Sequence, residues 1–142
     1  MTVNEVQDQV VEEFSLFDDW MDRYNYLIEL GRTLPVIDPK FKTNDYLIEG
    51  CQSKVWLYPS FDGKIITFTA DSDAIITKGI VALLIRVLSG RAPEEIINAD
   101  LYFIDKIGLK QNLSPTRSNG LLSMVKQMRL YAIAFKAKNQ LS

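Results

Sequence analysis

Residues 54–89 read KVWLYPSFDGKIITFTADSDAIITKGIVALLIRVLS, and this stretch decides the fold. In an extended chain, Val55 and Leu57 face one way while Trp56 and Tyr58 face the other. In residues 64–70, Ile66 and Phe68 likewise lie opposite Ile65, Thr67 and Thr69, so both segments fit strands with one buried face. The connecting residues 59–63 end in Asp-Gly, which is typical of a tight turn, so the segment predicts an antiparallel hairpin. Residues 74–89 are apolar on almost every side, which predicts a buried helix directly after the hairpin.

The flanking sequence adds helices on both sides of this hairpin. Apolar residues recur every third or fourth position in residues 3–30, and a cap-like Ser15-Leu-Phe-Asp18 step divides them, so two helices are expected there. A third short strand is predicted at residues 46–48. Ser114 and Pro115 supply the N-cap and first-turn proline of a long C-terminal helix. The predicted class is α+β, with a small antiparallel three-stranded sheet packed against helices.

Composition excludes several kinds of function. The chain has 142 residues, 47% of them hydrophobic, which suits one domain over residues 1–142. Its 18 acidic residues outnumber 16 basic ones, which disfavours a nucleic-acid partner. The absence of histidine argues against a metal site and against Ser-His-Asp or Cys-His catalysis. The longest apolar run, residues 80–85, is too short to cross a membrane, so a cytoplasmic protein is expected.

Cys51 is the one cysteine of the chain, so it cannot form an internal disulfide. Gly50 precedes it and the polar Gln52 and Ser53 follow it, between two predicted strands, which indicates a loop. Two interpretations stay open at this stage. The thiol is an inert packing group, or it is a nucleophile activated by basic residues, helix dipoles or a partner protein.

Arg117 is the second unusual feature. Counted from Ser114, it occupies the third position of the last helix, where a cation opposes the helix dipole at a cost of about 0.3–1 kcal/mol. Either a structural ion pair offsets this cost, or the guanidinium belongs to a site for an anion or thiolate. Upstream, Asp71 or Asp73 is expected to cap the helix over residues 74–89.

Three stretches resemble the successive signatures of the SufE family of cysteine desulfuration proteins. They are GCQSKVWL at residues 50–57, DSD at 71–73 leading into ITKGIVA at 76–82, and LSPTRSNGL at 113–121. Residues 18–24 and 28–31 also resemble the N-terminal helices of that family. The resemblance therefore covers nearly the whole chain and implies the fold shared by SufE and the IscU-type scaffolds.

The resemblance also implies a function. A SufS-type cysteine desulfurase would pass sulfane sulfur to Cys51, and the protein would stimulate this desulfurase. The sulfur would serve iron-sulfur cluster assembly on a downstream scaffold. The protein would be an activator rather than a stand-alone enzyme, without a cofactor of its own, because the pyridoxal phosphate belongs to the desulfurase. The residues implied at the docking surface are Gly50, Gln52, Ser53, Asp73, Arg117 and Asn119.

Some alternatives remain beside this expectation. The paralogue CsdE shares the same motifs, so a CsdA-type desulfurase is also a compatible partner, and either a monomer or a weak dimer is compatible with the sequence. A rival function is a non-covalent adaptor in which Cys51 is structural. A lone cysteine does suit a sulfur relay, because a second cysteine nearby would divert the sulfur into a disulfide.

Overall fold

Two strands, β1 (Val55–Phe61) and β2 (Ile66–Ser72), form the antiparallel sheet of the computed structural model, which describes residues 1–141. Their register places Val55 opposite Ser72 and Phe61 opposite Ile66. The Asp62 carboxylate closes the turn by accepting hydrogen bonds from the backbone N–H groups of Lys64 and Ile65, each at 2.8 Å. This confirms the predicted hairpin.

The hairpin differs from the prediction in its length. Pro59 lies inside β1 rather than in the turn, and it is paired with Phe68. A proline has no N–H group to donate to a neighbouring strand. In a two-stranded sheet each strand has one edge without a neighbour, and a proline is tolerated where its nitrogen faces that edge. The inward-facing residues are nevertheless those expected from the alternation, and all four are fully buried: Val55, Leu57, Ile66 and Phe68.

The predicted third strand at residues 46–48 is wrong. The chain makes a 3-10 turn at Asn44–Tyr46 and then meets β1 through a single bridge between Leu47 and Trp56. Gly50, with a φ of 89°, then redirects the backbone before a ladder can extend. The protein is therefore α+β but mostly helical, with a two-stranded sheet.

Seven α-helices account for most of the described chain: α1 (Val3–Ser15), α2 (Trp20–Leu30), α3 (Ile75–Leu88), α4 (Pro93–Asn98), α5 (Phe103–Lys106), α6 (Leu109–Asn112) and α7 (Pro115–Leu141). The break between the first two helices is confirmed, but its cap differs from the prediction. Asp19 is the N-cap of α2 and accepts from the backbone N–H of Asp22 at 2.9 Å, whereas the Ser15 hydroxyl donates to the Glu12 carbonyl.

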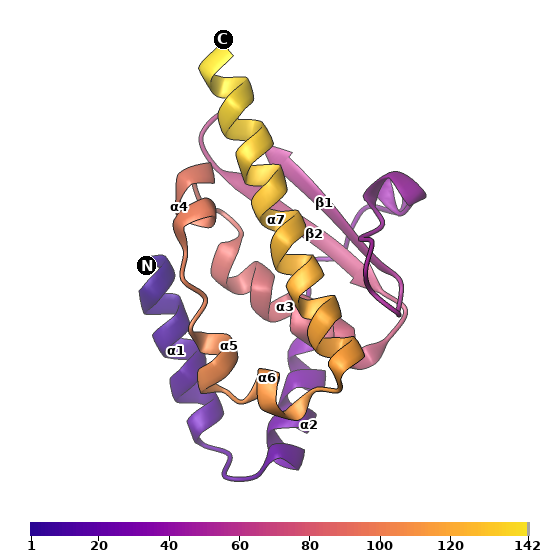
Figure 1. The fold of residues 1–142 in the computed structure, drawn as a ribbon, viewed down its shortest axis with the longest axis vertical. Helices are drawn as coiled ribbons and strands as arrows, with labels where there is room; N and C mark the ends of the chain where they lie inside the picture. Colours follow the sequence, from indigo (N-terminus) through magenta and orange to yellow (C-terminus); the bar gives the residue numbers. More distant parts are fainter. Residues whose placement is uncertain (142) are drawn as a thin grey trace.

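Helix α3 lies at the centre of the hydrophobic core and contacts α1, α2, α7 and β2 (Figure 1). Its contact with α2 depends on Gly79, where a Cβ atom would collide with the Leu27 carbonyl group. Helix α7 crosses in front of the sheet and carries the C-terminal end of the chain beyond the core. Hence the start of α7, the start of α3 and the segment before β1 meet on one side of the core.

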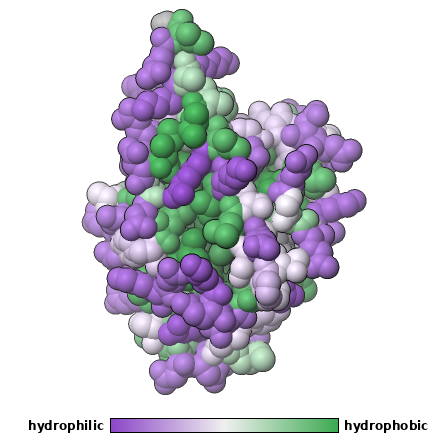
Figure 2. Space-filling view, in the orientation of Figure 1, coloured by the Kyte–Doolittle hydropathy of each residue, from purple (hydrophilic) through white to green (hydrophobic). Residues whose placement is uncertain are grey.

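The surface of α7 is of mixed polarity. Apolar residues gather along the axis of this helix and hydrophilic residues flank them (Figure 2). The exposed apolar side chains of α7 include Leu122, Leu130 and Ile133. Among the described residues, no helix combines the length and the apolar character needed to span a bilayer.

Candidate functional site

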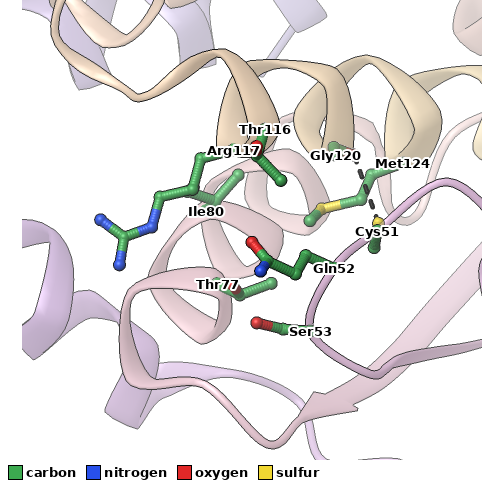
Figure 3. Close-up of a pocket in the computed structure, with 9 residues that line it drawn as sticks. All are labelled: Cys51, Gln52, Ser53, Thr77, Ile80, Thr116, Arg117, Gly120 and Met124. Atoms are coloured by element: carbon green, nitrogen blue, oxygen red, sulfur yellow. Dashed lines mark hydrogen bonds between the residues drawn. The ribbon is translucent and has the colours of Figure 1, made fainter.

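A small pocket lies beside Cys51, where three parts of the chain meet (Figure 3). Its cavity has a volume of about 100 Å³. The loop at residues 49–54, the first turns of α3 and the first turns of α7 enclose it. The lining residues are Cys51, Gln52, Ser53, Thr77, Ile80, Thr116, Arg117, Gly120 and Met124.

Gly50 lets the loop approach α7 closely enough to place Cys51 in this pocket. Its φ of 89° lies in the left-handed region, which favours glycine. A Cβ atom on Gly50 would also collide with the hydroxyl oxygen of Ser123 on α7. The backbone conformation therefore favours glycine immediately before the cysteine, and a side chain at this position would force Ser123 to move.

The Cys51 thiol is half-buried and donates a hydrogen bond to the carbonyl oxygen of Gly120 at 3.5 Å. Burial raises the pKa of this thiol above its ordinary value, because the thiolate loses solvation. The thiol is therefore protonated at neutral pH when the loop lies against α7. Attack on another sulfur atom requires the thiolate, so reaction depends on a change in these surroundings.

Arg117 lies at the first turn of α7, as predicted. The Ser114 hydroxyl accepts a hydrogen bond from the backbone N–H of Arg117 at 3.3 Å, which confirms the expected cap. The side chain is exposed, and its guanidinium makes no ion pair with any residue among 1–141. The structural ion pair considered from the sequence is therefore absent within this range, and the guanidinium points away from Cys51 across the pocket (Figure 3).

Neither Asp71 nor Asp73 caps α3, so that prediction is wrong. Asp73 accepts a hydrogen bond from the backbone N–H of Lys54 at 3.0 Å, and its own N–H donates to the Lys54 carbonyl at 3.3 Å. The Ser72 hydroxyl instead accepts from the N–H of Ala74, the N-cap residue, at 3.2 Å. Pairing with the start of β1 thus replaces the cap, and Asp73 secures the end of the loop that carries Cys51.

Asp71 has a separate role, away from the pocket. Its carboxylate forms ion pairs with Lys42 at 2.9 Å and with Lys78 at 3.4 Å. Burial alone would raise the pKa of Asp71, but hydrogen bonds from Lys42 and the Ser72 backbone, with the charge of Lys78, hold it below its ordinary value. Asp71 therefore joins the strand β2, the start of α3 and the segment before the sheet.

The structure brings together four of the seven predicted site residues in the pocket: Cys51, Gln52, Ser53 and Arg117. Gly50 is adjacent and positions the loop. Asp73 and Asn119 do not line the pocket. Asn119 is exposed and lies outside the pocket, because helix positions 117 and 119 project about 200° apart, whereas 117 and 120 project to the same side.

Five lining residues were not predicted: Thr77, Ile80, Thr116, Gly120 and Met124. Helical spacing from Arg117 could have indicated Gly120 and Met124, which follow it by three and seven positions. Thr77 and Ile80 lie within the ITKGIVA signature at residues 76–82, but nothing local indicates that they line a pocket with Cys51, because α3 reaches the pocket only through tertiary packing.

The pocket has polar walls and an apolar base. Ile80 and Met124 are each only 2% exposed, and they separate the cavity from the core.

The polar lining side chains without a hydrogen-bond partner in the described part of the chain are Gln52, Ser53, Thr77, Thr116 and Arg117. No group of three or more metal-ligating side chains occurs among the described residues. The arrangement suits thiol chemistry with an incoming sulfur compound.

The molecule is thus a small α+β protein with its one cysteine in a polar pocket. It belongs to the SufE family, because the family described as "SufE: Fe-S metabolism associated domain" matches residues 8–132. This match confirms the resemblance noted in the sequence.

Several relatives agree with this assignment. An uncharacterized SufE-like protein of Rhizobium etli is 45% identical over 127 residues, which cover 86% of each chain. A similar SufE-like protein of Rhizobium meliloti is 39% identical, over 86% of this chain and 91% of its own. SufE-like protein 1, chloroplastic/mitochondrial, of Arabidopsis thaliana is 38% identical over 93% of this chain, which corresponds to 36% of the plant protein.

One solved structure supports the fold. The solution structure of a hypothetical protein from Thermus thermophilus superimposes with a TM-score of 0.76, over 93% of this chain and 96% of the other. The two chains are only 19% identical, so this likeness concerns the fold alone.

Proposed function

We propose that the protein accepts sulfane sulfur on Cys51 from a pyridoxal-phosphate-dependent cysteine desulfurase of the SufS or CsdA type. It then passes this sulfur to a scaffold for iron-sulfur cluster assembly, in a reducing compartment such as the cytoplasm. The observation that carries the proposal is that the one thiol of a SufE-family chain lines a polar pocket with free hydrogen-bonding groups.

The proposed transfer is a thiol–persulfide exchange. The Cys51 thiolate attacks the outer sulfur of the desulfurase persulfide, so a bond forms between Cys51 Sγ and that sulfur. The S–S bond of the donor breaks, and its electron pair leaves with the donor cysteine as a thiolate. Sulfane sulfur changes carrier without net oxidation, so no redox cofactor is needed.

The closed loop suits a carrier that reacts only when it is docked. In the free protein, burial raises the pKa of Cys51 and keeps the thiol unreactive. Docking of the desulfurase would move the loop away from Gly120 and bring the thiol toward a more solvated or more positive environment. Arg117, exposed at the edge of the pocket, would help to orient an anionic segment of the partner or stabilise the transferring thiolate.

Incubation with the desulfurase and L-cysteine tests the proposal directly. The intact mass of the protein should rise by one sulfur atom, and a reductant should reverse the change. Cys51→Ser is the control and should take up no sulfur. An unchanged mass of the native protein, or sulfur uptake by the serine variant, would contradict the proposal.

A non-covalent adaptor is the second candidate, and the hydrogen bond from the Cys51 thiol to Gly120 favours it, because the thiol then has a structural partner. Partner turnover separates the two functions. An adaptor with Cys51→Ser should stimulate multiple turnovers of the desulfurase as well as the native protein does. A sulfur carrier with the same substitution should lose this stimulation.

A further inference from the structure

Thr77 is a buried residue whose hydroxyl group has no partner within residues 1–141 and lies at the wall of the Cys51 cavity. It is 7% exposed and lies in the first turns of α3, with its side chain in the lining of the Cys51 cavity. Its hydroxyl makes no hydrogen bond with any of residues 1–141. Thr77 lies in the first turn of α3, so the residue four positions earlier, Asp73, is outside the helix and the hydroxyl group has no bond to a helical carbonyl. The hydroxyl is therefore available to whatever occupies the cavity.

The free thiol does not use this hydroxyl. Cys51 donates its S–H to Gly120 on α7, whereas Thr77 lines the cavity from α3. Figure 3 shows the two side chains on different sides of the pocket. Of the five polar lining side chains without a partner among the described residues, Thr77 is the buried one, whereas the Cys51 thiol already has Gly120 as its partner. This difference suggests that Thr77 serves a later state of Cys51.

On the basis of the proposed function, we infer that Thr77 donates a hydrogen bond to the terminal sulfur of a Cys51 persulfide and holds this sulfur inside the cavity. The terminal sulfur would extend about 2 Å beyond Sγ, the length of an S–S bond. A cavity of about 100 Å³ has room for it, since one water molecule occupies about 30 Å³ in the liquid.

The surroundings strengthen such a hydrogen bond. A deprotonated persulfide carries its negative charge on the terminal sulfur, and hydrogen bonds to charged acceptors are roughly twice as strong as neutral ones. Ile80 and Met124, each 2% exposed, exclude water from the base of the cavity and lower the local dielectric constant. Thr77 would therefore favour the anionic persulfide and protect it from reaction with solutes.

Few other charged groups lie near the Cys51 persulfide. Among the residues lining the cavity, Arg117 is the one with a charged side chain besides the sulfur group of Cys51. Lys78, the neighbour of Thr77, forms an ion pair with Asp71. Asp73, at the end of the loop, is bound to the Lys54 backbone and lies outside the lining. The effect of the Thr77 hydroxyl on ionisation is therefore separable from that of Arg117.

The test compares Thr77→Val with Thr77→Ser. Valine keeps the shape of threonine without the hydroxyl, and serine keeps the hydroxyl without the methyl group. Each protein is loaded with sulfur by the desulfurase and L-cysteine, freed of the donor, and alkylated with iodoacetamide over a range of pH. The midpoint of the rate against pH reports the ionisation of the persulfide.

We expect the midpoint of Thr77→Val to rise by up to one pH unit, a change of up to about tenfold in the ionisation constant. Its persulfide should also decay faster on storage. Thr77→Ser should keep the native midpoint. Alkylation of the unloaded Cys51 thiol should be the same in all three proteins, because its partner is Gly120.

Two results would overturn the inference: a native midpoint in sulfur-loaded Thr77→Val, or a raised midpoint in both variants. Either result would leave the proposed sulfur transfer intact. Loading with inorganic polysulfide keeps the test independent of the desulfurase, so a failure of enzymatic transfer would count against the proposed function alone. If Thr77→Val folds poorly, Thr77→Ala replaces it in the same comparison.

Discussion

The Sγ atom of Cys51 lies 3.5 Å from the carbonyl oxygen of Gly120, although 69 positions separate the two residues in the chain. This contact joins the loop at residues 49–54 to the first turns of α7 and keeps the thiol half-buried. Accessibility of the thiol therefore depends on how firmly the loop is held against the helix. Three of the following predictions test this relationship.

Replacement of Gly50 by alanine should destabilise the closed loop. The left-handed backbone disfavours a side chain by about 1–2 kcal/mol, and the new Cβ atom would collide with Ser123. The loop should move away from α7, and iodoacetamide should alkylate the unloaded Cys51 thiol several times faster.

Gly63→Ala is the matched control for Gly50→Ala. Gly63 also has a positive φ, 98°, but no atom lies within 4 Å of the added Cβ position. Gly63→Ala should introduce a similar backbone strain and so lower the free energy of unfolding by about 1–2 kcal/mol. The alkylation rate of Cys51 should not change. Equal alkylation rates in the two alanine variants would contradict the role assigned to Gly50.

Asp73→Ala should also loosen the loop, because it removes the acceptor for the Lys54 N–H group. We expect a loss of about 1 kcal/mol or less in the free energy of unfolding, since the bond is exposed, together with faster alkylation of Cys51. Asp73→Asn keeps an oxygen acceptor and should behave like the native protein. Native alkylation rates in both variants would show that this bond does not hold the loop.

The pH dependence of stability should reveal the buried thiol. Burial raises the pKa of Cys51 in the folded state above its ordinary value of 9.0, so the folded protein retains this proton at higher pH than the unfolded chain. The resulting stability is present below about pH 9 and is lost as the pH rises through the folded pKa. The free energy of unfolding in urea should fall more for the native protein than for Cys51→Ser between neutral pH and about pH 10. Equal losses in the two proteins would contradict the burial of the thiol.

Arg117→Ala should lower the rate of sulfur transfer severalfold. The free energy of unfolding should stay the same or rise slightly, because the cation opposes the dipole of α7 and makes no ion pair among residues 1–141. Lys138→Ala removes an exposed cation from the other end of the same helix and should leave transfer unchanged. A large loss of stability in Arg117→Ala would instead indicate a structural role.

Several features follow from short stretches of sequence. The alternation in residues 54–70, the Asp62-Gly63 turn and the Ser114 cap of α7 all occur in the structure. Each depends on residues within about four positions of one another, where backbone geometry and hydrogen bonding are decided locally. The motifs around Cys51 and Arg117 likewise indicated the family, which the family match confirms.

Tertiary structure alone decided the features that depend on distant residues. Residues 46–48 have strand-like sequence but form only one bridge, and Asp73 has capping chemistry but bonds to Lys54 instead. The approach of α3 and α7 brings Thr77 to the Cys51 cavity and provides the burial that raises the pKa of the thiol. Such burial arises from packing between elements far apart in the chain, and local periodicity carries no information about it.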